Sequence, residues 1–291
     1  MRSRRTFLCA GAAHWDVIAR ASVDIGPGGD VPGQVIRRPG GVAANVAMGL
    51  AKLKCSVQLC AIIGADPAGD ELKRELSAGG VNCEPIVAQS SSTDTYVAIE
   101  DRDGELIAAV AENPDWRDLA RPFHKRATTA LSGCSDLFVD ATLPSDTVLE
   151  LATSAASQGV PIIANPVSPA KAHRLNVLMQ RELNVCIVAN LAEANALTNQ
   201  PVPDALSAAE LLIEQGACAA LVTNGIESSA LVTCAGSATI TPPRLQGARS
   251  VTGAGDALLA AFLAAPERYN DPQSTLLGAI NAAAEHIKAT R

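Results

Sequence analysis

SVTGAGDALLAAFLAA, residues 250–265, is the stretch that does most to decide the fold. Gly253, Ala254, Gly255 and Asp256 open an apolar run that has the spacing of a buried helix. Small residues at such a position let backbone N–H groups approach an anion, and a helix N-terminus favours negative charge. The pattern predicts an anion hole with a carboxylate beside it. An ordinary helix start fits these four residues equally well, because Asp stabilises the first turn of any helix.

Working outward from this stretch, apolar runs bounded by turn residues alternate with segments of helical spacing. The alternation predicts βαβ units and a mostly parallel sheet with helices packed on it. Ligands bind at the carboxyl ends of the strands in such sheets. Strands are expected at 6–13, 57–66, 136–142, 160–167, 183–190 and 218–225, and helices at 42–53, 68–80, 146–159 and 204–216.

Two segments interrupt this alternation. One is rich in Gly and Pro and follows the first strand, and the other, TYVAIEDRDGELIAAVAE at 95–112, alternates around an Asp-Gly turn and indicates a β-hairpin. A hairpin inserted in a βαβ chain suggests a small sheet that closes over a ligand site, and an extension of the main sheet is the alternative. We expect one domain over residues 1–291, with a lid formed by about 17–38 and 93–112.

Composition argues against two classes of partner. Hydrophobic residues make up 48% of the chain, yet no apolar run approaches the ~20 residues that a membrane-spanning helix needs. The formal net charge is −7, and the basic clusters at 2–5, 37–38 and 121–126 are short and far apart. Nucleic-acid binding requires basic residues gathered on one face. We therefore expect neither a membrane nor a nucleic acid as partner.

The cysteines predict free thiols rather than a metal site. No two form a C-x-x-C pair and the four histidines have no ligand spacing, so structural zinc has no support. Most lie inside apolar runs, as small buried residues do in a reducing compartment. The eight are Cys9, Cys55, Cys60, Cys83, Cys134, Cys186, Cys218 and Cys234.

The first residues, MRSRRTFLCAGAAHWD at 1–16, allow two interpretations. Ser-Arg-Arg before Phe-Leu resembles the start of a twin-arginine export signal. The same residues suit a basic tail before a buried strand, Thr6 to Ala13, that leads to a functional carboxylate at Asp16. The apolar part after Arg5 has only about seven residues and no convincing cleavage site follows it. The strand is favoured, and with it a cytoplasmic protein.

Two further motifs join ligand-binding side chains to helix starts. RRPGGVAANVAMGLAKL places Gly40 and Gly41 before a helix with Asn45 on its second turn, where glycine permits close backbone approach and Asn can bind hydroxyl groups. NLAE places Asn190 and Glu193 on one helix face, where a carboxylate suits Mg²⁺ and its waters. Taken alone, each also fits an ordinary helix start. No P-loop, dinucleotide-binding or protein-kinase motif is found.

In this order, the motifs resemble those of the ribokinase-like, or PfkB, carbohydrate kinases. The likeness covers nearly the whole chain, and its strongest part is the pairing of the diglycine loop with GAGD about 210 residues later. The matching stretches are GAAHWD at 11–16, PGGVAANVA at 39–47, IIGAD at 62–66, NLAE at 190–193, TNG at 223–225 and VTGAGDA at 251–257.

The resemblance implies both a fold and a reaction. The implied fold is a ribokinase-like three-layer α/β/α sandwich with a mostly parallel central sheet and a small β-sheet lid. The implied reaction is phosphate transfer from ATP, with Mg²⁺, to a sugar or nucleoside. Within the family, NPVSPAK at 165–171 and TYVAIEDRDGEL at 95–106 are most similar to pseudouridine kinases. The leading hypothesis is therefore phosphorylation of the ribose 5′-hydroxyl of pseudouridine.

The resemblance also implies a role for each matching residue. Asp256 would be the general base towards the 5′-hydroxyl, with a pKa lowered by the helix N-terminus. The ribose hydroxyls would be bound by Asp16, Gly40, Gly41 and Asn45. The anion hole would consist of Gly253, Ala254 and Gly255.

On the nucleotide side, the resemblance implies that Asn190 and Glu193 organise Mg²⁺ through its water shell. Lys171 could reach the transferring phosphate, and a solvated lysine is the alternative. The nucleotide would be bordered by Thr223, Gly225 and Asn281.

Three positions depart from the family pattern. Ser228 stands where a second glycine is expected in the nucleotide loop, and Asn165 replaces an aspartate. Ser250 replaces another aspartate, so a monovalent cation site for K⁺ is only a possibility. The chain stops at EHIKATR without the usual final helix and turn, and we expect an adenine pocket that is either more open or completed by other residues.

Alternatives remain at the level of substrate and of class. A ribokinase, another nucleoside kinase or a fructokinase-like enzyme would share most of these motifs. A catalytically inert sugar- or nucleoside-binding regulator is the alternative from another class, although a mere binder has no need of Asp256. Relatives dimerise through their lids, which would cover exposed strand edges, and a homodimer is expected here too.

Overall fold

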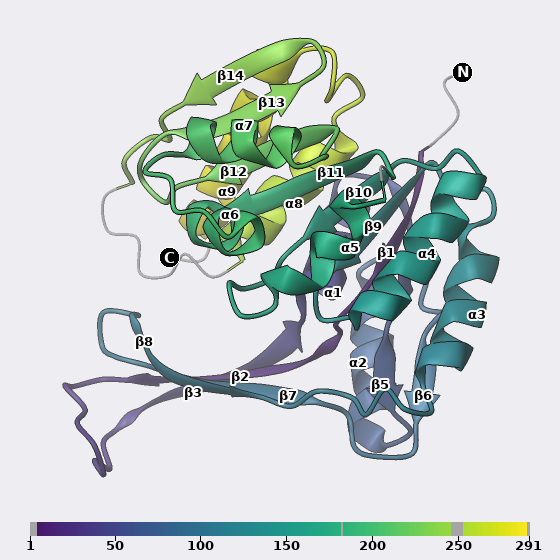
Figure 1. Cartoon of the computed structure of the whole chain (residues 1–291). Helices are drawn as coiled ribbons and strands as arrows, with labels where there is room; N and C mark the ends of the chain where they lie inside the picture. The colour runs from purple at the N-terminus through teal and green to yellow at the C-terminus, as the bar shows by residue number, and fades with distance from the viewer. Residues whose placement is uncertain (1–4, 182, 246–252, 290–291) are drawn as a thin grey trace.

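The computed structural model describes residues 5–181, 183–245 and 253–289, and within them an eight-stranded sheet forms the centre (Figure 1). Its strand order is β14-β13-β12-β11-β10-β9-β1-β4, in which β4 to β12 run parallel and β13 and β14 are antiparallel. The strands are β1 (Thr6–Ala10), β4 (Ser56–Cys60), β9 (Asp136–Asp140), β10 (Ile162–Asn165), β11 (Val185–Asn190), β12 (Ala219–Thr223), β13 (Ser229–Thr233) and β14 (Gly236–Ile240).

Helices cover both faces of this sheet, because its central strands are apolar on both sides. In β1, Leu8 packs into one core and Phe7 and Cys9 into the other. The first core is closed by α3 (Ala120–Leu131), α4 (Ser145–Ser157), a 3₁₀ turn (Ala172–Leu175), α5 (Asn176–Met179), α6 (Leu191–Thr198) and α7 (Ala205–Glu214). The second is closed by α1 (Val42–Lys52), α2 (Pro67–Ala78), α8 (Ala254–Ala264) and α9 (Pro272–Ala289). The predicted three-layer α/β/α sandwich is confirmed.

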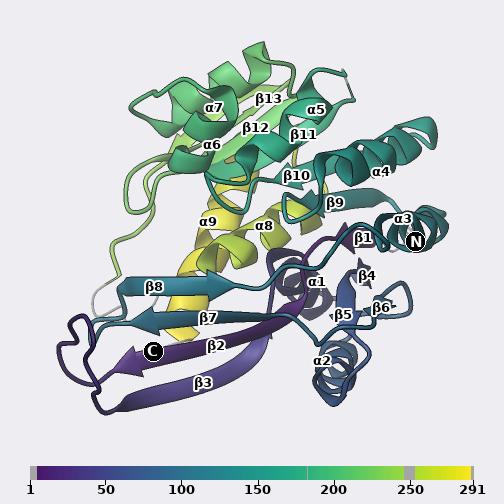
Figure 2. The ribbon, with the colours of Figure 1, turned by 60° about the horizontal axis from the view of Figure 1, so that its bottom comes forward.

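The predicted hairpin belongs to a separate four-stranded sheet, not to an extension of the main one (Figure 2). Its order is β3-β2-β7-β8, and we call it the lid sheet. Its strands are β2 (His14–Ala21), β3 (Gly33–Gly40), β7 (Thr95–Glu100) and β8 (Leu106–Ala111). A two-stranded sheet of β5 (Ile62–Gly64) and β6 (Val87–Gln89) lies in the connection between the two parts.

The first strand is shorter than predicted, and Asp16 does not stand at its end. β1 stops at Ala10, and Asp16 lies inside β2 of the lid sheet. Between them the chain turns, because the Gly11 N–H donates to the Cys60 carbonyl at 3.1 Å and the Ala12 N–H donates to the Asp140 carboxylate at 3.0 Å. These bonds fix the turn by which the chain leaves the main sheet after β1 and enters the lid sheet at β2.

Arg5, the last residue of the basic N-terminal cluster, is part of the folded structure. It pairs with Asp136 at 2.6 Å and donates to the Leu263 and Ala265 carbonyls at the end of α8. Arg268 reaches the same Asp136 and the Leu263 carbonyl. The predicted strand is therefore present in a shorter form, as β1. In the described ranges, no helix has the length and apolar character needed to cross a membrane.

The cysteines are free thiols, but the expectation of burial is only partly right. Six are buried or half-buried, whereas Cys218 and Cys234 are exposed. Each exposed cysteine lies just outside a strand, Cys218 before β12 and Cys234 after β13. An apolar run in the sequence therefore predicts a strand in the core, but it does not predict whether the residues at the ends of that strand are buried.

We predict that the close packing of α1 on α8 requires Gly49. A Cβ atom at Gly49 would lie 2.6 Å from the Ala260 Cβ, so Gly49→Ala should force the helices apart and lower the free energy of unfolding by roughly 1–3 kcal/mol. Gly278→Ala is the control, because Gly278 lies in α9 with open space beside it, and there alanine should stabilise by about 0.5–1 kcal/mol. Urea unfolding of both variants checks this, and equal effects would contradict it.

Candidate functional site

A buried carboxylate, Asp140, organises the carboxyl end of the main sheet. It ends β9 and accepts N–H bonds from Ala12 and Ala43 at 3.0 Å each and from Thr142 at 2.9 Å. Burial raises the pKa of Asp140, and these hydrogen bonds oppose that rise. The turn after β1 and the first turn of α1 are thereby fixed to one group. The sequence prediction omitted Asp140, although an aspartate that ends the apolar run DLFVD was a usable signal.

Because Gly40 and Gly41 have no side chains, the backbone before α1 can lie against Asp16 and against the turn after β1. A Cβ atom at Gly40 would lie 2.0 Å from the Asp16 carboxylate, and one at Gly41 would lie 2.4 Å from the Ala12 carbonyl oxygen. Gly41 also has φ of 95°, a conformation that favours glycine. Asp16 is buried, with Nδ1 of His14 at 3.3 Å and Nε of Arg38 at 3.9 Å from its two oxygens. The predicted substrate residues thus lie together.

The GAGD stretch begins α8 as predicted, and Asn45 connects it to the diglycine helix. Gly253 is the N-cap with φ of 85°, and a Cβ atom there would lie 2.9 Å from Nε2 of His286. Gly255 has open space beside it. Nδ2 of Asn45 donates to Oδ2 of Asp256 at 2.8 Å. The starts of two helices, far apart in the sequence, therefore share one hydrogen bond at the site.

The predicted lowering of the Asp256 pKa is wrong, because surrounding protein raises this pKa to about 7. Loss of hydration is the largest cause, and the negative charges of Asp140, Asp16 and Glu193 add to it. The hydrogen bond from Asn45 opposes the rise. Burial and three carboxylates outweigh the helix N-terminus, and a strongly perturbed carboxyl group of this kind is typical of functional sites.

Asn190 and Glu193 form a capping box at the start of α6. The Asn190 side chain accepts from the Glu193 N–H at 2.9 Å, and the Glu193 carboxylate accepts from the Asn190 N–H at 3.0 Å. Burial raises the pKa of Glu193. In the described part of the chain, no group of three metal-ligating side chains converges. These residues fit Mg²⁺ only through its waters, the form that Mg²⁺ usually takes beside phosphates.

Lys171 lies at a small pocket beside the lid sheet. Burial lowers the pKa of Lys171, and the charge of Asp140 opposes that change. The pocket is also lined by His14 and Thr142 and by Asp94 and Glu112 at the base of the lid sheet. This places Lys171 between Asp140 and the lid sheet. Asn165, the departure from the family aspartate, ends β10 and donates to the Val188 carbonyl of β11 at 2.8 Å. Its Oδ1 accepts from the Val167 N–H at 2.9 Å, which fixes the start of the loop that leads to Lys171.

The residues predicted for the nucleotide lie further along the sheet. Thr223 ends β12, and Gly225 follows with φ of 58°. Ser228, which replaces the expected glycine, bonds the Thr241 hydroxyl at 2.8 Å. Asn281 is exposed on α9, a helix that packs against β13 and β14. Ser250, the position that bears on a K⁺ site, lies outside the described residues.

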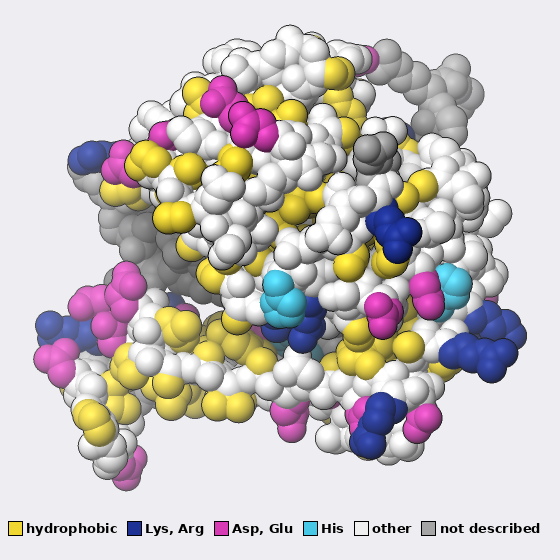
Figure 3. Space-filling view, viewed as in Figure 1, with side chains coloured by type: hydrophobic (Ala, Val, Ile, Leu, Met, Phe, Trp, Pro, Cys, Tyr) yellow, Lys and Arg dark blue, Asp and Glu magenta, His cyan; other side chains and the backbone are white. Residues whose placement is uncertain are grey.

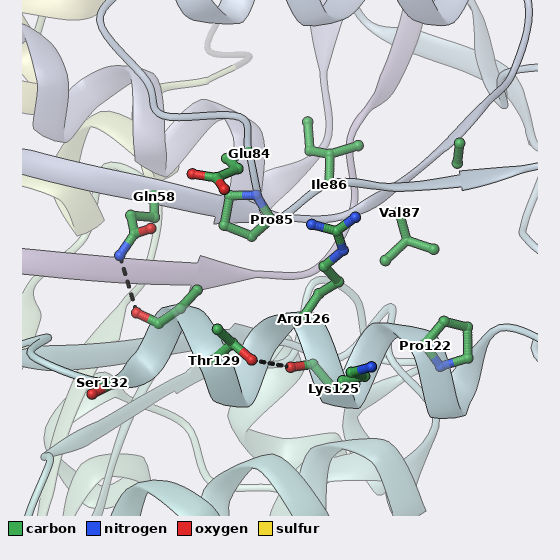
Figure 4. Close-up of a pocket in the computed structure, with 12 residues that line it drawn as sticks. Gln58, Glu84, Pro85, Ile86, Val87, Pro122, Lys125, Arg126, Thr129 and Ser132 are labelled. Carbon is green, nitrogen blue, oxygen red and sulfur yellow. Dashed lines mark hydrogen bonds between the residues drawn. The ribbon is translucent and has the colours of Figure 1, made fainter.

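A larger groove of about 910 Å³ lies elsewhere, between α3 and the segment before β6 (Figure 4). Lys125 and Arg126 line it from the helix, and Pro85 and Ile86 line the opposite side. None of the predicted site residues reaches this groove. Among the described residues that line it, Glu84 is the one carboxylate, so this groove lacks the paired carboxylates found around Asp256.

Comparison with known proteins identifies the family of this chain. The profile of the "pfkB family carbohydrate kinase" matches residues 6–290. A pseudouridine kinase of Arabidopsis thaliana is 33% identical over 168 residues, which are 57% of this chain and 43% of the relative. A pseudouridine kinase of Escherichia coli is 23% identical over 266 residues, which are 89% of this chain and 83% of the relative. The match thus spans less than half of the Arabidopsis protein.

Solved structures share the architecture over nearly the whole chain. A carbohydrate kinase from Agrobacterium tumefaciens is 29% identical with a TM-score of 0.79, and covers 98% of this chain and 91% of its own. A ribokinase from Giardia lamblia is 17% identical with a TM-score of 0.80, covers 98% of this chain and 92% of its own, and shows the fold alone. With a family profile that extends from the first strand to the last helix, the chain belongs to the pfkB family of carbohydrate kinases.

Proposed function

We propose that this protein is an ATP-dependent kinase that phosphorylates the ribose 5′-hydroxyl of pseudouridine. The observation that carries the proposal is the position of Asp256, on the first turn of α8 beside open Gly255 and hydrogen-bonded to Asn45. A carboxylate with a raised pKa beside a helix N-terminus suits proton transfer next to a phosphate. The names of the Arabidopsis and Escherichia coli relatives support pseudouridine as the nucleoside.

In the proposed reaction, Asp256 accepts the proton of the 5′-hydroxyl while the 5′-oxygen bonds to the γ-phosphorus of ATP. The bond between that phosphorus and the bridging oxygen breaks, and ADP leaves. Phosphoryl transfer needs alignment and charge stabilisation more than a strong base. N–H groups from Gly253 to Gly255 would stabilise the phosphate oxygens, while Asp16 and Asn45, with Gly40 and Gly41, would hold the ribose.

Cations would complete the nucleotide side of the proposed site. Mg²⁺ would neutralise phosphate charge, and Glu193 with Asn190 would hold it through water. Thr223 and Gly225 would border the nucleotide, and Asn281 the adenine. Lys171 would approach the transferring phosphate from the lid side. We also propose that K⁺ activates the enzyme. The eight free thiols suit the cytoplasm, where we place the protein.

We also propose a homodimer formed through the lid sheet. The strand pairing puts Val17, Ala19, Val35, Val97, Ile99 and Val110 on one face, opposite to the face of Asp16. Val35 and Val110 are each 70% exposed. Figure 3 shows hydrophobic side chains gathered along the lid sheet and charged side chains at the end far from the main sheet. An apolar sheet face of this kind is usually covered by a partner.

The first prediction is the substrate preference. With Mg-ATP, the purified protein should release ADP with pseudouridine faster than with uridine, ribose or fructose. Asp256→Asn should lower kcat roughly 10²–10⁴-fold, because it removes the proton acceptor while keeping the side-chain size. A coupled ADP assay measures both. Preference for another sugar would contradict pseudouridine as the substrate but leave the kinase reaction in place. Nucleoside binding without turnover would favour an inert regulator.

The second prediction concerns pH. Because Asp256 must be deprotonated to accept a proton, kcat/KM should rise about tenfold per unit as pH increases towards about 7 and level off above it. Asn45→Ala removes the hydrogen bond that lowers this pKa, so the midpoint should move to higher pH even if the plateau falls. A profile from pH 5 to 9 measures both midpoints. A midpoint that stays the same or moves lower would contradict the assignment.

The third prediction concerns assembly. Val35→Glu combined with Val110→Glu places charges on the apolar face and should convert the dimer to monomers. Val23→Glu is the control, since Val23 is exposed but lies outside the strands of the lid sheet. Light scattering gives the molar mass of each protein. A monomeric unmodified protein, or a dimer that survives the double substitution, would rule out this interface.

A further inference from the structure

His14 occupies a junction between the predicted ribose site and the pocket beside the lid sheet. It is the first residue of β2, two positions before Asp16, and its Nδ1 lies 3.3 Å from Oδ1 of Asp16. Its ring also packs near Tyr96, at 6.1 Å between ring centroids. The same ring lines the pocket that contains Lys171. One side chain therefore faces both parts of the site.

The two ring nitrogens of His14 have different surroundings. Nδ1 is buried and makes no aligned hydrogen bond, and the carboxylate of Asp16 is the acceptor beside it. A buried polar atom without a partner is costly, so Nδ1 should carry the proton and point it at Asp16. A ring that carries its proton on Nδ1 has a lone pair on Nε2. Among the described residues, Nε2 of His14 has no hydrogen-bond partner.

The pocket beside His14 is rich in hydrogen-bond acceptors. Asp94 accepts from Gln89 at 3.3 Å and Glu112 from the Thr95 N–H at 2.8 Å, and in each pair only one carboxylate oxygen is used. Lys171 also lines this pocket and brings a positive charge. Arg38 lies behind it, with its Nε 3.9 Å from Oδ2 of Asp16. The apolar part of the lining is Ile62, Pro114 and Trp116. A flat ring that brings N–H donors fits such a lining better than a ring that brings only carbonyl groups.

Resting on the proposed function, we propose that His14 is a positioning and specificity-determining residue for the nucleoside. Through Nδ1 it orients Asp16 towards the ribose. Through Nε2 it accepts a hydrogen bond from a ring N–H of the base. Pseudouridine is joined to ribose through carbon and keeps two ring N–H groups, whereas uridine keeps one. His14 thus distinguishes the two isomers by the N–H group that uridine lacks.

Entry of a base requires movement at one side of this pocket. Its volume is about 40 Å³, which holds only a few water molecules. The outer wall comes from Ala111 to Trp116, a segment that is largely exposed and leads out of β8. Exposed segments with little burial move at low cost in free energy. His14, by contrast, is held in β2 between β3 and β7 and stays a fixed point of recognition.

Two substitutions separate the two nitrogens. In His14→Asn the amide lies near the position of Nδ1, and in His14→Gln it lies near that of Nε2. Steady-state kinetics would be measured with pseudouridine, uridine and 1-methylpseudouridine, whose methyl group replaces one ring N–H. Thermal unfolding of each variant checks that the fold is intact.

The unmodified enzyme should prefer pseudouridine to uridine and to the methylated nucleoside by about tenfold in kcat/KM or more, as one hydrogen bond allows. His14→Asn should lose this preference and keep the KM for uridine. His14→Gln should keep the preference and raise KM for both natural nucleosides.

Unchanged discrimination in His14→Asn would overturn the inference while leaving the proposed function intact. Equal losses in both variants with a lower melting temperature would assign His14 a structural role and also overturn it. Failure of the unmodified protein to phosphorylate pseudouridine would instead refute the proposed function. These results are separable because the first two require an active enzyme.

Discussion

The hydrogen bonds to the buried Asp140 carboxylate are the constraint on which the site depends. They join the end of β9, the turn after β1 and the first turn of α1. That turn leads into β2 and so sets where Asp16 lies, while α1 sets where Asn45 lies. A carboxylate held by several N–H groups is costly to rearrange, because each group would lose its partner in a buried place. The positions of Asp16 and Asn45 are therefore set by the fold itself.

The opposite half of the site is built on accumulated negative charge. Burial is the largest cause of the raised Asp256 pKa, and the charges of Asp140, Asp16 and Glu193 add to it, so the pKa is about 7. Asn45 limits this rise and at the same time joins α1 to α8. Helix N-termini at Gly41 and Gly253 offer positive ends of dipoles in the same region. A cation bound beside these carboxylates would offset their charge, and the two helix N-termini would attract the phosphate, which fits a family of carbohydrate kinases.

The lid sheet has two faces with different surroundings. Its inner face carries Asp16 and borders the pocket at His14, whereas its outer face exposes Val35 and Val110. Near the main body, the sheet is held by Trp15, whose ring nitrogen donates to the Ala68 carbonyl at 2.9 Å. Arg37 stacks 3.5 Å from the centre of the Trp15 ring and pairs with Glu71 of α2. The proposed substrate recognition and the proposed dimer would thus use one element anchored at one end.

Local patterns in the sequence determined the alternation of strands and helices, the hairpin and the helix starts at Gly41 and Gly253. Apolar runs and turn residues act over a few neighbours, so these features could be predicted from neighbours alone. Only the tertiary structure decided where β1 ends, because Asp140, far along the chain, captures the Ala12 N–H. It also reversed the expected pKa shift of Asp256, since burial is its largest cause and the carboxylates that add to it come from three other segments. Burial and charge at a site are sums over residues that the fold brings together, and no local stretch contains them.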